Sequence, residues 1–138
     1  MKIFIDAGAF LALEIQNDQN HLLAKRYFNS LKNKRALFFT NDYVLDEAYT
    51  RLIYDLHLNI AYTFHKYISQ LLKENQLSLL EVEPAVREKA WHELLKFSEH
   101  KLSFTDGVII VHFRKYHLDE IFTFDRHFRN INLPTNLL

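Results

Sequence analysis

The stretch EIFTFDRHF, residues 120–128, begins with the character of a strand and ends in charge. Its apolar, aromatic and β-branched residues are typical of a buried strand, and Asp125 stands where that run stops. We therefore expect a strand over Ile121–Phe124 that delivers a carboxylate at its carboxyl end.

The opening of the chain has the same pattern. MKIFIDAGAF, residues 1–10, carries a short apolar run directly into Asp6. Similar runs recur along the sequence. The strands that we expect are Lys2–Ile5, Ala36–Thr40, Leu77–Val82 and Ile121–Phe124, with Asn130–Leu133 as a short fifth.

Segments with helical periodicity alternate with these strands. Two helices in succession follow the second strand, at about Val44–Leu56 and Asn59–Asn75, and the last helix spans roughly Thr105–Tyr116. The alternation predicts an α/β fold with a mostly parallel sheet and an inserted helical arm beside it. No Pro-, Gly- or Ser-rich linker divides the chain, so we expect residues 1–138 to form a single domain.

Composition excludes several classes of protein. The sequence has no cysteine, which excludes disulfides and thiolate metal sites. No apolar run approaches the ~18–20 residues that a membrane span needs, and no signal peptide is recognisable, so a cytoplasmic location is expected. The 17 basic and 17 acidic residues cancel, which argues against broad electrostatic coating of nucleic acid. The zero net charge is compatible with an enzyme that contacts the phosphate of its substrate through a bound metal ion.

Four acidic residues are expected to converge on one edge of the sheet. Asp6 and Asp125 end strands, Asp106 opens the last helix, and Glu47 lies in the second turn of the helix after the second strand. In a parallel sheet all of these positions fall at the carboxyl edge, where open α/β sheets bind their ligands. Carboxylates that crowd together repel unless a cation sits among them, and oxygen ligands suit Mg²⁺ or Mn²⁺.

Each acid also has a purely structural interpretation. Asp6 and Asp125 are also compatible with solvated strand ends, and Glu47 with a surface pair to Arg51 at i, i+4. Ser103 and Asp106 have the spacing of a capping box at a helix N-terminus. Further acids map near the same edge, so topology alone does not select the set; they are Asp42, Asp46, Glu81 and Glu83.

Several motifs together resemble a PIN domain, and in particular a toxin ribonuclease of the VapC type. The opening FIDAGAFLAL resembles the first strand and acid of that family, and TNDYVLDEAYT resembles the motif that contains the second acid, here Glu47. The most specific likeness is KLSFTDGVIIVHFRKYHLDEIFTFDRHF, which carries the third and fourth acids as Asp106 and Asp125. One departure is Ala7–Gly8, where many members have a hydroxyl residue, so that Thr105 and Thr123 are the remaining candidate hydroxyl donors.

The resemblance implies a PIN-like parallel sheet of about five strands flanked by helices, and Mg²⁺- or Mn²⁺-dependent cleavage of RNA. It also implies a homodimer that a small antitoxin neutralises. In that scheme Asp6, Glu47 and Asp106 are the main catalytic and metal-binding acids, and Asp125 completes the set. The expected RNA contacts are Thr105, Arg126 and His127.

Two other functions stay open at this stage. A phosphatase with an aspartyl nucleophile also begins with a strand that ends in Asp, although that class commonly has a second Asp two residues later, where this chain has Gly8. A PIN fold that only binds RNA or protein is the other alternative. The sequence does not identify the RNA, the antitoxin or the number of metal ions.

Overall fold

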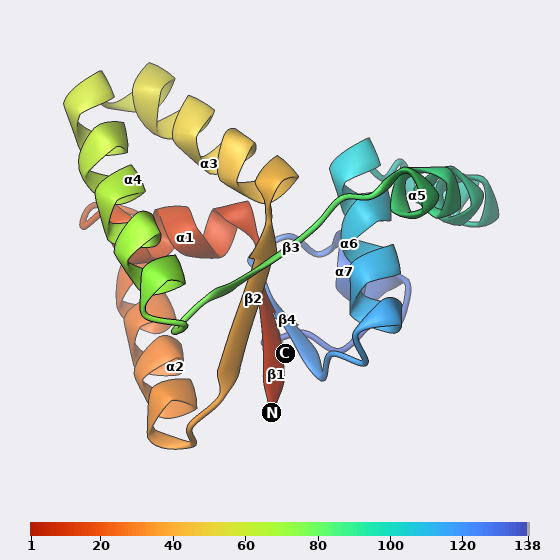
Figure 1. Ribbon diagram of the computed structural model, residues 1–138, viewed down its shortest axis with the longest axis horizontal. Coiled ribbons are helices and arrows are strands. Elements are labelled where there is room, and N and C mark those ends of the chain that lie inside the picture. Colours follow the sequence, from red (N-terminus) through yellow and green to blue (C-terminus); the bar gives the residue numbers. More distant parts are fainter. Residues whose placement is uncertain (138) are drawn as a thin grey trace.

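The computed structural model describes residues 1–137, in which strands and helices alternate (Figure 1). The strands are β1 (Lys2–Ile5), β2 (Leu37–Asn41), β3 (Ser78–Leu80) and β4 (Glu120–Phe122). The helices are α1 (Ala7–Glu14), α2 (His21–Asn33), α3 (Asp42–Asp55), α4 (Leu58–Lys73), α5 (Pro84–Lys96), α6 (Phe104–Lys115) and α7 (His127–Asn130), with a 3₁₀ turn at Ser98–His100.

The four strands form one parallel sheet in the order β3-β2-β1-β4. The first strand of the sequence is therefore central: Phe4 pairs with Phe39 of β2 on one side and with Ile121 of β4 on the other. Because all four strands run the same way, their carboxyl ends share one edge of the sheet. The parallel α/β architecture predicted from the sequence is confirmed, with four strands among residues 1–137 in place of about five.

The predicted fifth strand at Asn130–Leu133 is wrong. Asn130 ends α7, and Asn132 has a left-handed φ of 65°. The amides of Asn132 and Leu133 donate to the carbonyls of Arg129 and Phe128, which is the hydrogen-bond pattern of a Schellman helix end. This backbone cannot continue as a strand, and the sheet gains only an isolated bridge between Ile121 and Thr135.

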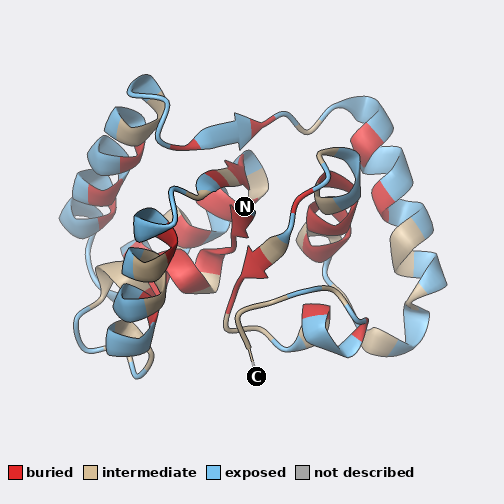
Figure 2. Ribbon diagram, turned by 90° about the horizontal axis from the view of Figure 1, so that it is seen from below, coloured by how far each residue is buried: buried red, intermediate tan, exposed pale blue. Residues whose placement is uncertain are grey.

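The helices cover both faces of the sheet. Figure 1 shows α1 to α4 on one side of the strands and α5 to α7 on the other. The predicted helical arm is the pair α3 and α4, which pack against each other. Burial is greatest in β1 and β4, in α1 and along α6, whereas β3 is mostly exposed and the outer helices bury only one face (Figure 2). Among the described residues, no helix combines the length and the apolar character needed to cross a bilayer.

Candidate active site

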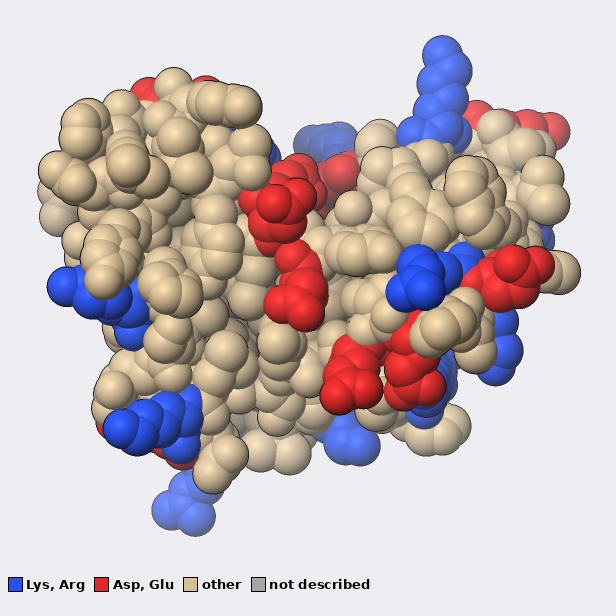
Figure 3. Space-filling model, turned by 45° about the horizontal axis from the view of Figure 1, so that its top comes forward, with Lys and Arg blue, Asp and Glu red and all other residues tan. Residues whose placement is uncertain are grey.

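The carboxyl edge of the sheet gathers the acids that the sequence analysis singled out. Asp6 follows β1, Glu47 lies in the second turn of α3, Asp106 is the third residue of α6, and Asp125 lies just beyond β4. Figure 3 looks toward the end of the sheet where β2 runs into α3, and acidic side chains gather near the middle of that face. A hollow of about 300 Å³ opens there, which we call the acidic hollow; its lining includes Asp6, Glu47 and Asp125.

Asp6 is the most deeply placed of these acids. It is 7% exposed and caps α1, with one carboxylate oxygen accepting a 2.8 Å hydrogen bond from the Ala7 amide. The other oxygen accepts a 2.8 Å hydrogen bond from the Thr123 hydroxyl, which confirms Thr123 as a hydroxyl donor. Burial raises the pKa of Asp6 to about 7 against these two bonds, and the charges of Asp106 and Glu47 add to the rise.

Asp106 is both a helix cap and a member of the acidic set. Its Oδ2 accepts a 2.9 Å hydrogen bond from the Ser103 amide, while the Ser103 hydroxyl accepts from the Asp106 amide, so the predicted capping box is confirmed. The box fixes the side chain at the first turn of α6. The structural and the functional interpretation of Asp106 are therefore compatible.

Asp125 and His127 lie in a turn that is stabilised by two hydrogen bonds. The Asp125 amide donates to the Thr123 hydroxyl at 2.9 Å, and the His127 amide donates to Asp125 Oδ1 at 2.8 Å. The imidazole Nδ1 of His127 then lies 3.2 Å from Asp125 Oδ2 and 3.4 Å from Asp106 Oδ2. His127 thus turns toward the acids, whereas its neighbour Arg126 is exposed.

Glu47 is the most accessible acid of the set. Partial burial of its carboxyl raises its pKa, the nearby cation of Arg51 lowers it, and Asp106 and Asp125 raise it again. Within residues 1–137 the Glu47 carboxylate and the Arg51 guanidinium form no ion pair, although both line the acidic hollow. The alternative interpretation of Glu47 as half of an i, i+4 surface pair is therefore not supported, and the Glu47 carboxylate stays available.

The donor atoms at this edge fit a divalent cation. Asp106, Asp125 and His127 each offer one ligand atom, and these three atoms lie within 4.8 Å of one another. Burial raises the pKa values of Asp6 and Glu47, and the charges of nearby acids raise them further, which is an electrostatic setting that a cation relieves. Thr105, by contrast, forms no side-chain hydrogen bond among the described residues.

A buried polar network that the sequence did not reveal joins the two sides of the sheet. The side-chain oxygen of Asn41 accepts from the Val44 amide and so caps α3. The side-chain nitrogen of Asn41 lies 3.1 Å from His112 Nδ1. On the other side of its ring, His112 Nε2 lies 2.9 Å from the Glu81 carbonyl, and burial lowers the pKa of the imidazole. A neutral ring that donates through Nε2 and accepts at Nδ1 satisfies both contacts. The network holds the start of α3, which carries Glu47, against α6, which carries Asp106.

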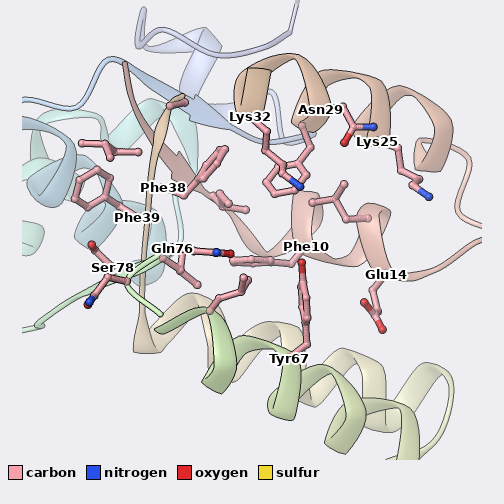
Figure 4. A pocket seen from close by; sticks show the side chains of 18 of the residues that line it. Phe10, Glu14, Lys25, Asn29, Lys32, Phe38, Phe39, Tyr67, Gln76 and Ser78 are labelled. Atoms are coloured by element: carbon pink, nitrogen blue, oxygen red, sulfur yellow. The ribbon is translucent and has the colours of Figure 1, made fainter. Parts of the chain in front are cut away.

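A second and larger hollow, the apolar pocket, lies between α2 and α4 over β2 (Figure 4). It has a volume of about 870 Å³, and aromatic rings such as Phe10, Phe38 and Tyr67 line it. Lys25 and Lys32 stand at the α2 side, and none of the four acids described above belongs to its lining.

Comparisons with known proteins agree on the fold. Residues 3–133 match the family model described as PIN domain. The structure is similar to that of Mycobacterium tuberculosis VapC20, a sarcin-ricin loop cleaving toxin, with a TM-score of 0.83 and 24% identity over 95% of each chain. It is also similar to VapBC2 from Rickettsia felis, bound to a promoter DNA fragment, with a TM-score of 0.68 and 15% identity over 99% of this chain and 98% of that chain. No curated protein matches the sequence.

Proposed function

The chain belongs to the PIN domain family, and on this premise we propose that it is a metal-dependent ribonuclease. The observation that carries the proposal is the gathering of carboxylates at the carboxyl edge of the sheet, where burial first and neighbouring acids second raise the pKa values of Asp6 and Glu47. We assign Asp6, Glu47, Asp106 and Asp125 as the acids that hold Mg²⁺ or Mn²⁺, directly or through water. A divalent cation held there would lower the pKa of water and neutralise charge that develops on phosphate oxygens.

Hydrogen bonds within the protein orient two of these carboxylates without any bound RNA. Thr123 directs the Asp6 carboxylate through its hydroxyl, and Ser103 directs Asp106 through its amide. Asp125 lies nearer the surface, where it would orient the attacking water. Arg51, at the rim of the acidic hollow, is a cation suited to a phosphate of the bound RNA, together with the exposed Arg126.

The biological role proposed is that of a toxin in a toxin–antitoxin pair. Its support is the likeness of the fold to the VapC20 toxin and to VapBC2. A small antitoxin would neutralise the enzyme in the cytoplasm, and the active form would be a homodimer. Cleavage of a structured RNA loop, as in VapC20, is the first substrate class to test.

The reaction is tested with purified protein and a panel of structured RNAs in Mg²⁺, in Mn²⁺ and in chelator. We expect endonucleolytic products in either metal and none in chelator. Undiminished cleavage in chelator would refute the metal-dependent mechanism. Release of phosphate from small monoesters, without RNA cleavage, would favour a phosphatase.

The toxin role is tested separately by inducing wild type and Asp106→Asn from the same promoter. We expect growth arrest from wild type alone, because the variant loses one of the proposed metal-binding carboxylates. Equal arrest at equal abundance would show that catalysis is not the cause. Sedimentation of the purified protein tests the homodimer.

A further inference from the structure

His127 has an orientation that RNA binding alone does not explain. Its side chain is 43% exposed, yet its Nδ1 atom is buried and has no hydrogen-bond partner. Buried polar atoms without a partner are rare in native structures, and a bound ion is one of the ordinary reasons for one. The atom lies 3.2 Å from Asp125 Oδ2 and 3.4 Å from Asp106 Oδ2, and neither contact has hydrogen-bond geometry.

These separations match the spacing of neighbouring ligands around one cation. In an octahedral site with bonds of about 2.1 Å, adjacent ligand atoms lie about 3 Å apart. The separations of His127 Nδ1 from the two aspartate oxygens therefore fit neighbouring positions in such a site, and the ligand atoms of all three residues lie within 4.8 Å of one another. The backbone supports this placement, because the His127 amide is held by the carboxylate of Asp125, the residue whose other oxygen faces the ring.

We propose that His127 is a metal ligand, which binds through Nδ1 beside Asp106 and Asp125 and so favours Mn²⁺ over Mg²⁺. The inference rests on the proposed function for the presence of a metal. It adds a nitrogen to a site whose other proposed ligand atoms are all oxygens. Imidazole suits the transition metals, whereas Mg²⁺ prefers oxygen ligands and water, so the nitrogen discriminates between the two ions.

The ligand is tested by pulsed electron paramagnetic resonance of the Mn²⁺-loaded protein. We expect a ¹⁴N coupling to Mn²⁺ in wild type that is lost in His127→Gln. The matched control is His92→Gln, at an exposed position on α5, which should keep the coupling. A wild-type spectrum without the coupling would overturn the proposal and would favour an imidazolium that only pairs with the two aspartates.

Selectivity is tested by calorimetric titration of the same proteins with MnCl₂ and MgCl₂. We expect His127→Gln to lose about tenfold or more in affinity for Mn²⁺ and less than about threefold for Mg²⁺. Equal losses for both ions, or no loss, would overturn the proposal. Thermal unfolding in chelator shows whether the variant is folded. Because neither readout uses RNA, a failure to cleave RNA would refute the proposed function while leaving the ligand assignment intact.

Discussion

Two hollows of this protein differ in almost every physical property. The apolar pocket is the larger, at about 870 Å³, and aromatic rings line it. The acidic hollow has only about 300 Å³, and its lining includes three of the four assigned acids. A large apolar concavity is the usual first choice for a ligand site. Here the direction of the strands is the better guide, because it brings the carboxylates to the smaller hollow.

The comparison also separates two kinds of surface. In the acidic hollow, burial and, to a smaller extent, the charges of neighbouring acids raise the pKa values of Asp6 and Glu47. The apolar pocket contains none of the four assigned acids, and it offers a ligand mainly apolar contact area. Chemistry should therefore depend on the acidic hollow alone, and the following substitutions test that separation.

The largest expected effect is on RNA cleavage. Asp106→Asn should lower the cleavage rate by a factor on the order of 10³, because it removes one of the carboxylates proposed to hold the cation that acts on water and phosphate. Tyr67→Ala, in the lining of the apolar pocket, should leave the rate within about threefold. The measurement is single-turnover cleavage of one RNA at saturating metal. A comparable loss in both variants would break the distinction between the hollows.

The next effect is a pH dependence of stability that belongs to Asp6. Its pKa is about 7 in the fold against an ordinary value of 3.8, so between these values the fold binds one more proton than the unfolded chain. The free energy of unfolding of metal-free protein should therefore fall as pH rises from about 4 to 7, by a few kcal/mol. Urea denaturation in chelator measures this fall.

Asp6→Asn serves as the matched variant for that measurement. It should show a flatter pH profile than wild type and a higher stability at pH 8 in chelator, because it cannot ionise. Parallel profiles for the two proteins would mean that Asp6 is not the group whose raised pKa lowers the stability.

A smaller effect is the thermal shift on adding metal. Ligand at about 100 times its Kd adds roughly 2.7 kcal/mol to the folded state, which for this length is roughly 5–10 °C. Wild type should show that shift with Mn²⁺, and Asp6→Asn and Asp106→Asn much less. Glu81→Gln, an exposed acid just after β3, should behave as wild type. If Glu81→Gln loses the shift and Asp106→Asn keeps it, the wrong acids were assigned.

The smallest effect compares the Thr123 hydroxyl, which bonds to Asp6 beside the acidic hollow, with a hydroxyl in the lining of the apolar pocket. Thr123→Val should cost about 1–2 kcal/mol, because it leaves the partly buried Asp125 amide without its acceptor. Thr63→Val, in the lining of the apolar pocket, should cost no more than about 0.5 kcal/mol, because that exposed hydroxyl only bonds back to its own helix. Urea denaturation at one pH measures both, and equal costs would contradict the comparison.

The sequence was informative where local pattern determines structure. Apolar runs that end in Asp6 and Asp125 predicted where β1 and β4 deliver their acids, and the Ser103-x-x-Asp106 spacing predicted the capping box. Such patterns gave a wrong prediction where the backbone forms a turn in place of a strand. Residues 130–133 are apolar enough for a strand, but Asn132 adopts the left-handed conformation that ends α7.

Contacts between distant parts of the chain were beyond prediction from one sequence. Asn41 and His112 are 71 residues apart, and no local spacing signals that they meet. The orientation of His127 was missed for a related reason. Its neighbour Asp125 was visible in the sequence, but Asp106, which it also faces, comes from another helix.

The central position of β1 has a consequence for biosynthesis. The Asp6 amide donates to the Phe122 carbonyl, and the Asp6 carboxylate depends on the hydroxyl of Thr123, more than a hundred residues later in the chain. A growing polypeptide therefore contains Asp6, already held locally by the Ala7 amide, long before β4 has been translated and can bring the Thr123 hydroxyl to its other oxygen. The proposed arrangement around Asp6 is therefore complete only after β4 has paired beside β1.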